Sequence, residues 1–238
     1  MGWLEDLAAG MAVGAPRPAL SPSLVFDDVR AAIAMVEEAI AERRGATQDE
    51  GMARAVKAAQ DPFHDYVREP VSAPMAATMW KSALTFPRIL RGAMLISVGS
   101  HVEHVLRSWC SLLEKRWSLP KPLGPKPRGA SDLQNCMTYL RDVAGLALAD
   151  YPQWKEWEAL DAYRVARNRL AHNGGIVLDP DEQRKVSALP CMKVETFGLL
   201  ADEPSIFIDE GACEAAADNA RAFFDRLSTI CAQDVRAK

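Results

Sequence analysis

A long segment of helical periodicity dominates this sequence. Residues 87–117 read "PRILRGAMLISVGSHVEHVLRSWCSLLEKRW", and apolar side chains recur there every three or four positions: Leu90, Met94, Val98, Val102, Val105, Trp109 and Leu112. This spacing places them along one stripe of an α-helix. Pro87 suits the first helical turn. The segment therefore predicts a long helix that buries one face in a helical bundle.

The other segments fit the same fold class. Apolar periodicity and capping residues predict a helix over 23–44 with Gly45 just past its end, a weaker helix over 46–60, and further helices near 71–85, 131–145, 152–172 and 210–235. The proline-rich residues 118–130 must form a loop. Short runs in "CMKVETFG" and "SIFID" predict a small β-hairpin. The expected fold is all-α: a bundle of four to five helices with a small β-hairpin after the helix that ends near residue 172.

Two regions are expected within the chain. Residues 1–22 contain three prolines and predict a loose arm, and residues 1–84 as a whole predict an N-terminal helical extension without an assigned role. Residues 85–238 predict the helical bundle domain.

Composition excludes several classes of protein. No run of about eighteen uncharged apolar residues is present, so a membrane span is not expected. The first residues carry acids rather than a basic signal-peptide start, so we expect a cytoplasmic protein. The five cysteines are far apart and lack a C-x-x-C pair, which predicts buried, reduced thiols. We expect no metal and no cofactor.

Basic residues gather in one part of an acidic chain. The net charge is −4, yet residues 107–128 hold six basic residues and one acid, Glu114. Lys121, Lys126 and Arg128 lie in the proline-rich part of this segment. Two interpretations stand: a solvated helix end and loop, or an edge that faces a polyanion such as RNA.

The stretch 164–177, "RVARNRLAHNGGIV", holds the candidate catalytic residues. Arg167 and His172 are five residues apart, which on a regular helix is about 7.5 Å of rise and about 140° of azimuth. They do not face each other within one helix. Gly174 and Gly175 permit a left-handed turn, so His172 belongs to the final helical turn, where the carbonyl end of the helix favours a protonated imidazole.

These residue types suit the cleavage of RNA. A base must take the proton of a ribose 2′-OH, an acid must protonate the leaving 5′-oxygen, and a cation must stabilise the phosphorane. His172 can perform either proton transfer, Arg167 can bind phosphate oxygens bidentately, and Asn168 adds a neutral donor and acceptor. The bare spacing is not specific, because a helix end with an exposed histidine gives the same pattern.

The motif resembles that of a known family. "RNRLAHNGG" resembles the Arg-x(4–6)-His signature of the HEPN superfamily, in which a polar residue follows the arginine. "LISVGSHVEHVLRSWCSLLEK" resembles the long helix that precedes the motif in that family, and "LQNCMTYLRDVAGLAL" resembles the approach to it. The resemblance covers roughly residues 85–235.

Membership implies a function. Arg167, Asn168 and His172 take the motif positions, in a site that this family forms at a two-fold dimer interface. The implied reaction is metal-independent endoribonucleolytic cleavage that leaves a 2′,3′-cyclic phosphate and a 5′-hydroxyl. The implied role is a toxin or an effector of defence against phage. The expected partners are RNA, a second copy of the chain, and an antitoxin or regulatory protein.

Further polar residues have two interpretations each. Arg164 either extends the phosphate clamp or pairs with Asp161 or Glu158, while Arg169 is expected to be a solvated charge. Glu103 either orients His172 or Arg167 or is an exposed helix charge.

His101 and His104 lack a third metal ligand at a suitable spacing. Trp154 and Trp157 suit a dimer contact.

Two rival functions remain open at this stage. The first is a HEPN-like module that binds RNA or a protein without cleaving it. The second is a structural helical subunit in which the motif is a chance helix end.

Overall fold

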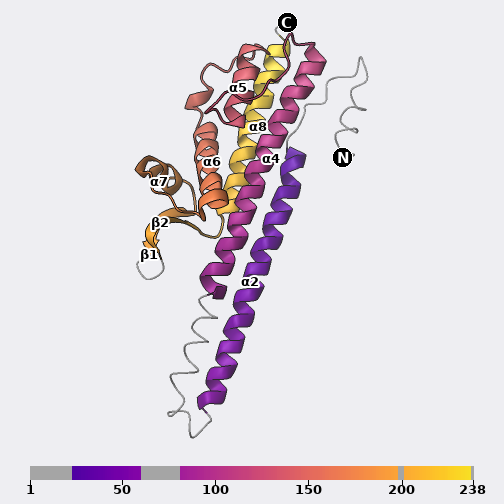
Figure 1. Cartoon of the computed structure of the whole chain (residues 1–238). Coiled ribbons are helices and arrows are strands. Elements are labelled where there is room, and N and C mark those ends of the chain that lie inside the picture. Colours follow the sequence, from indigo (N-terminus) through magenta and orange to yellow (C-terminus); the bar gives the residue numbers. More distant parts are fainter. Residues whose placement is uncertain (1–22, 60–80, 198–200, 237–238) are drawn as a thin grey trace. The chain divides into compact units, whose positions relative to one another are not determined.

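The computed structural model describes residues 23–59, 81–197 and 201–236, and this part of the chain is mainly helical (Figure 1). Its α-helices are α2 (Ser23–Ala59), α4 (Phe86–Trp117), α5 (Asp132–Asp142), α6 (Lys155–Asn173), α7 (Pro180–Ser187) and α8 (Ala212–Arg236). Strands β1 (Met192–Phe197) and β2 (Ala201–Ile208) form an antiparallel pair. The prediction of a mainly α protein with a small hairpin is confirmed. The predicted arm over 1–22 and most of the expected helix over 71–85 lie outside the described residues.

The contacts divide the chain into two compact units. One comprises Met1–Asp28, Val102–Glu158 and Asp218–Lys238, and the other comprises Val29–His101 and Ala159–Ala217. The long helices α2, α4, α6 and α8 each contribute residues to both. The boundary expected after residue 84 stays a prediction. None of the described helices has the length and apolarity needed to cross a lipid bilayer.

Two helix boundaries differ from the sequence-based prediction. Helix α2 continues through Gly45 instead of ending there. A glycine inside a helix costs only about 1 kcal/mol relative to alanine, which a helix of 37 residues tolerates. Helix α6 begins at Lys155, not at Pro152, because Tyr151–Gln153 form a 3₁₀ turn and Trp154 then adopts extended backbone (φ −73°, ψ 132°).

Helix α4 and helix α5 begin as the sequence predicts. Pro87 lies in the first turn of α4. Ser131 caps α5: its hydroxyl accepts a hydrogen bond from the amide of Gln134 (3.1 Å), and the Gln134 side chain accepts one from the amide of Ser131 (3.1 Å). This reciprocal capping box satisfies two amides that the helix leaves without partners.

Aromatic side chains fill the core of the first unit. Phe223 and Phe224 of α8 lie 5.3 Å apart, centroid to centroid, and Trp154 and Trp157 each pack against Phe223 at 6.2 Å. Trp109 contacts Phe224 edge-on. Because Trp154 and Trp157 are buried in this cluster, they are core residues, and the dimer contact suggested for them from sequence is wrong.

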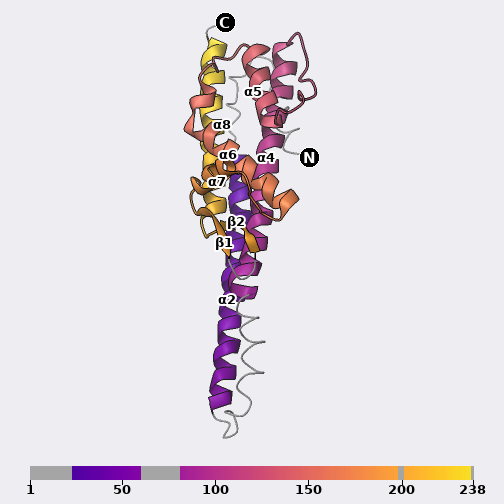
Figure 2. The same cartoon turned by 60° about the vertical axis from the view of Figure 1, so that its left-hand side comes forward.

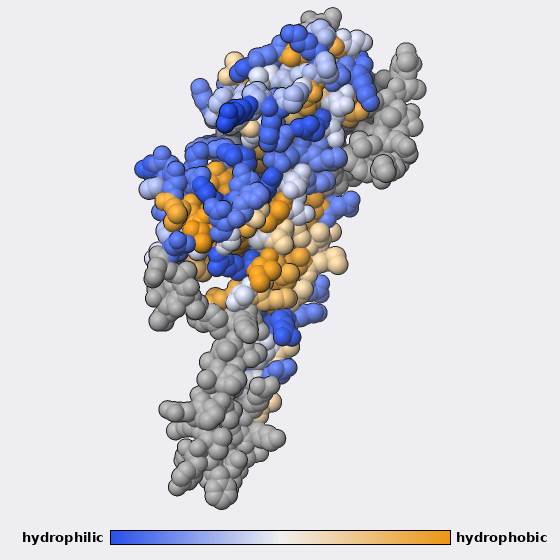
Figure 3. Space-filling model, in the orientation of Figure 1, coloured by the Kyte–Doolittle hydropathy of each residue, from blue (hydrophilic) through white to orange (hydrophobic). Residues whose placement is uncertain are grey.

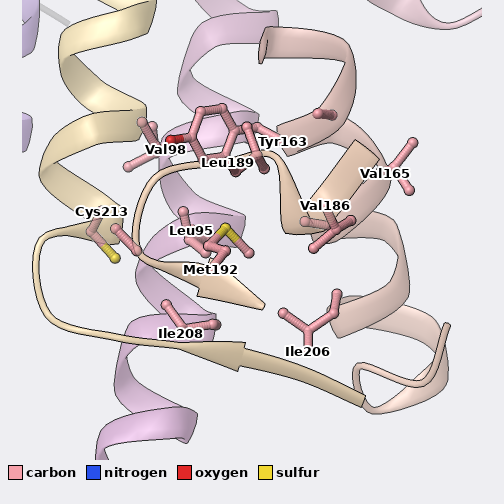
Figure 4. Packing of buried hydrophobic residues seen from close by; sticks show 14 of the residues in the cluster. Leu95, Val98, Tyr163, Val165, Val186, Leu189, Met192, Ile206, Ile208 and Cys213 are labelled. Atoms are coloured by element: carbon pink, nitrogen blue, oxygen red, sulfur yellow. The ribbon is translucent and has the colours of Figure 1, made fainter. Parts of the chain in front are cut away.

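The second unit has an aliphatic core (Figure 4). One buried cluster includes Leu95 and Val98 of α4, Tyr163 and Val165 of α6, Val186 of α7, and Met192, Ile206 and Ile208 of the hairpin. Ile33 of α2 belongs to the same cluster. The sequence analysis missed α7, although its signals are present: Asp179 caps its first amides and Pro180 occupies the first turn.

The hairpin packs beside α7, as both views of the chain show (Figures 1 and 2). Met192 pairs with Ile208 and Val194 with Ile206, so these four side chains share the face directed at the core. The run that starts at Ile176 joins β2 only through an isolated bridge to Ser205.

The cysteine prediction holds for three of five positions. None of the five forms a disulfide, and Cys110, Cys136 and Cys213 are buried. Burial, followed by the neighbouring Glu214 and Glu37, raises the pKa of Cys213 to about 12. Cys191 is exposed and Cys231 partly so. Cys191 occupies a left-handed turn (φ 57°) directly before β1.

A buried ion pair joins α2 to α4 within the second unit. Arg91, whose side chain is 4% exposed, donates from Nε and Nη2 to the two carboxylate oxygens of Glu37 at 2.8 and 2.6 Å. Its Nη1 donates to the carbonyl of Ile208 (3.4 Å). The Glu37 carboxylate raises the pKa of Arg91. The guanidinium is thus matched by a bidentate partner, as burial of a charge requires.

Replacing Glu37 by glutamine should destabilise the protein by roughly 3 kcal/mol, because the buried guanidinium then keeps only the exposed carboxylate of Glu210, 4.0 Å away, as a counter-charge. The free energy of unfolding in urea measures this loss. Glu38 is the matched control, since it is the next residue on α2 and is exposed. Glu38→Gln should change stability by less than about 0.5 kcal/mol, and equal effects of the two substitutions would contradict the assignment.

Candidate functional site

Helix α6 carries all three residues of the motif in regular helical geometry. It extends from Lys155 to Asn173, so Arg167, Asn168 and His172 precede its end, and His172 lies in the last turn as predicted. His172 is exposed, while Arg167 and Asn168 are partly buried. In a regular helix Arg167 and His172 point about 140° apart. One copy of α6 therefore does not bring the two side chains together.

A glycine of α4 makes room for Arg167. A Cβ atom placed on Gly99 would lie 2.8 Å from Cδ and 3.7 Å from Cγ of Arg167. Carbon atoms do not approach so closely, so a glycine is needed if the Arg167 stem is to lie across α4 here. The sequence alone does not distinguish Gly99 from the other helical glycines, since Gly45 lies inside α2 with nothing within 4 Å of the place of a Cβ.

The end of α6 is fixed by two left-handed glycines and by β2. Gly174 and Gly175 have φ values of +60° and +88°. The amide of Gly175 donates to the carbonyl of Arg169 (2.9 Å), and the carbonyl of Gly175 accepts from the amide of Ile206 (2.9 Å). The chain therefore leaves the helix two residues after His172, and the residues that follow pair with β2.

Side chains add a second set of contacts at this helix end. Nε of Arg169 donates to Glu182 of α7 at 2.6 Å. With its amide oriented so that both groups have partners, Asn173 accepts from Nη1 of Arg169 (2.9 Å) and donates to the carbonyl of His172 (3.1 Å). The expectation that Arg169 is a solvated charge is wrong. Its partner lies on α7, the helix that the sequence analysis missed.

Arg164 forms an ion pair within α6. Its Nε and Nη2 lie 3.0 and 2.7 Å from one oxygen of Asp161, and Nζ of Lys185 lies 2.8 Å from the other. Burial tends to raise the pKa of Asp161, but the hydrogen bonds from Lys185 and Arg164 outweigh it, and the pKa of this carboxyl is lowered. Of the two interpretations of Arg164, the pair with Asp161 is present. An additional role at phosphate remains a prediction.

The basic segment and Glu103 belong to the other contact unit. Lys126 and Arg107 both pair with Asp132, at 3.1 and 2.5 Å. Lys121 and Arg128 are exposed, and neither has an ion-pair partner among the described residues. The carbonyl of Lys121 accepts a hydrogen bond from the hydroxyl of Tyr139 (3.0 Å), which anchors the loop to α5. Glu103 is partly buried on α4, and its auxiliary role stays a prediction.

In the described ranges, no group of three or more histidine, cysteine, aspartate or glutamate side chains is arranged to hold a metal ion. Comparison of the chain with protein-family models, with curated proteins and with solved structures finds no match.

Substituting Gly99 by alanine should displace the Arg167 side chain without unfolding the protein. Alanine favours a helix by about 1 kcal/mol over glycine, but its Cβ would occupy the place of Arg167 Cδ. We expect the Nε–H resonance of Arg167 to shift in an NMR spectrum, while the melting temperature stays near that of the wild type.

Gly92 provides the matched control on the same helix. A Cβ there would meet Leu170 at 3.7 Å and Ile208 at 3.8 Å, which are ordinary contacts. Gly92→Ala should leave the Arg167 resonance unchanged. An unshifted Arg167 in Gly99→Ala would contradict the close approach.

Asp161 should contribute stability that depends on pH. Because its folded pKa lies below the usual value of about 3.9, the contribution is present above that value and is lost as pH falls through the lower folded pKa. We expect Asp161→Asn to cost about 1 kcal/mol at pH 7, and this difference from the wild type to shrink below about pH 4. Urea unfolding across this range measures it.

The control for this measurement is Asp225→Asn, since Asp225 is exposed and has no ion-pair partner in the described part of the chain. Its effect should be small at every pH. A cost of Asp161→Asn that stays constant down to pH 2 would show that the carboxylate charge is not what stabilises the fold.

Proposed function

We propose that this protein is a metal-independent endoribonuclease of the HEPN type, active as a homodimer. The observation that carries the proposal is the arrangement of α6: an exposed His172 in a firmly held last turn, with Arg167 laid across Gly99 of α4. An arginine and a histidine held on one rigid element are the groups that RNA cleavage without a metal requires.

The proposed chemistry distributes the two proton transfers over two copies of His172. One imidazole takes the proton of the ribose 2′-OH, and the 2′-oxygen attacks the adjacent phosphorus. The other imidazolium protonates the leaving 5′-oxygen, so the products are a 2′,3′-cyclic phosphate and a 5′-hydroxyl. Arg167 stabilises the charge of the phosphorane through two parallel hydrogen bonds, and Asn168 contacts the same phosphate.

A dimer resolves the geometric difficulty of a single helix. Since Arg167 and His172 point about 140° apart on α6, one protomer cannot close both around one phosphate. A two-fold axis near the end of α6 would supply the missing pair from the partner subunit. Lys121, Lys126 and Arg128 are the residues proposed to guide RNA, and Glu103 and Arg164 the auxiliary ones.

The proposed biological role is a toxin or an effector of defence against phage that acts in the cytoplasm under the control of an antitoxin or regulatory protein. This role rests on the resemblance of residues 164–177 to the family motif.

RNA cleavage in EDTA tests the proposal. Purified full-length protein should cut total or transfer RNA and leave cyclic-phosphate ends. His172→Ala should lower the cleavage rate at least 100-fold, the lower end of what general acid–base catalysis contributes. Arg167→Lys should fail similarly, because an ammonium group cannot make the bidentate contact. Gly99→Ala should lose activity while Gly92→Ala keeps it.

His104→Ala is the control for histidine loss, since His104 is exposed on α4 outside the motif. Retained cleavage by His172→Ala would exclude the proposed proton transfer. Sedimentation equilibrium checks the oligomeric state, and an active monomer would exclude the composite site. Binding of RNA without cleavage by wild type would favour the non-catalytic module instead.

A further inference from the structure

The second unit contains a cavity that the proposed ribonuclease site does not use. Its volume is about 560 Å³, within the range of roughly 300–1,000 Å³ typical of small-molecule sites. Neither Arg167 nor His172 lines it. Its walls come from α2, from residues 83–85, from the start of α4, from the end of α6 and from strand β2. They are mostly apolar: Leu84, Ile89, Ile96, Leu170, Phe207 and Ile208.

Part of this apolar wall is open to solvent. Ile89 is 62% exposed and Leu84 is 39% exposed. Apolar side chains are visible among polar ones on the face shown in Figure 3. Large apolar groups exposed together beside a cavity indicate a surface that a ligand covers.

Three arginines border the cavity, and they differ in their partners. The charge of Arg91 is matched by Glu37 in the buried pair described above. Arg44 and Arg88, by contrast, donate only to main-chain carbonyls, those of Ala83 (3.2 Å) and Gly174 (3.0 Å). Among the described residues, neither has a carboxylate within ion-pair distance. Two guanidinium groups in the lining of the cavity thus have no ion-pair partner in the described part of the chain.

Arg88 is held in place on several sides. Its guanidinium lies over the ring of Phe207, 5.6 Å from the centroid. Nη2 also lies close to Gly175, where an added Cβ would be 3.1 Å away. Arg88 is thus preorganised in the wall of the cavity, which lowers the entropic cost of binding an anion there.

The cavity also has one acidic residue at its edge. Asp209 lines it, but its carboxylate lies 3.8 Å from Nζ of Lys193. The Ser205 hydroxyl donates to the carbonyl of Glu203 (3.3 Å). The walls therefore offer few polar groups to the apolar part of a ligand. The guanidinium groups of Arg44 and Arg88 are then the groups that can bind a charged part.

We propose that this cavity binds a small amphipathic anion, a molecule with an apolar body and one carboxylate or phosphate head. The body lies against Leu170, Phe207 and Ile96, and the head accepts hydrogen bonds from Arg88 and Arg44. The same chemistry excludes cations and disfavours neutral molecules of equal size. This site is independent of RNA cleavage, and it contacts Gly174, two residues beyond His172.

Isothermal titration calorimetry on the full-length protein tests the site with four probes of equal chain length: octanoate, octyl phosphate, 1-octanol and octyltrimethylammonium. Octanoate, octyl phosphate or both should bind at one saturable site, and which of them binds identifies the head group. The alcohol should bind at least tenfold more weakly, since a hydrogen bond to a charged group is worth about a factor of ten. The cation should not bind.

Variants and NMR locate the binding. Arg88→Gln and Arg44→Gln should each weaken anion binding about tenfold, while Arg43→Gln, an exposed neighbour on α2, should leave it unchanged. The amide resonances of Gly174, Gly175 and Phe207 should shift on titration. The proposal is overturned if the alcohol or the cation binds as well as the anions, if neither anion binds, or if the shifts lie elsewhere.

Discussion

The termination of α6 at two consecutive left-handed glycines is the constraint on which both candidate sites depend. A residue with a Cβ is strained at the φ values of Gly174 and Gly175. This turn places the residues after the helix beside β2, where they form backbone hydrogen bonds. The turn leaves His172 exposed in the last helical turn. In the same turn, the carbonyl of Gly174 accepts a hydrogen bond from Arg88. One turn therefore positions both His172 and an arginine that lines the cavity.

Two glycines of α4 mark where α6 packs against it, and only Gly99 is tight enough to exclude a Cβ. Gly92 and Gly99 are seven residues apart on α4, two helical turns, and they meet Leu170 and Arg167 of α6 in reverse order. The helices therefore run antiparallel and close together here, which is why the stem of Arg167 can lie across α4. Near Gly92, Leu170 of α6 lines the cavity, so the contact between α4 and α6 holds both a motif residue and a residue of the cavity wall.

Periodicity and caps predicted the elements whose signals are local. The stripe on α4, the Ser131 cap of α5 and the exposed place of His172 at the end of α6 all follow from nearby residues. Helix α7 was also marked locally, by Asp179 and Pro180, but the run is short and almost entirely polar, so it has no apolar stripe to detect. The partners of charged residues were not predictable in the same way. Arg169 meets Glu182 and Arg91 meets Glu37 only after the chain has folded, because each pair joins separate elements.

Several basic residues of the motif helix and of the basic segment form ion pairs within the molecule. Fewer basic side chains are therefore available to bind an anion. Arg164 is committed to Asp161, Arg169 to Glu182, and Lys126 to Asp132. Because these three charges are paired, fewer unpaired positive charges are present than the sequence suggests. An acidic chain then has little nonspecific electrostatic attraction for RNA. Affinity for a polyanion must come from a few placed groups rather than from net charge. In the proposed homodimer, a two-fold axis would double such groups around one phosphate.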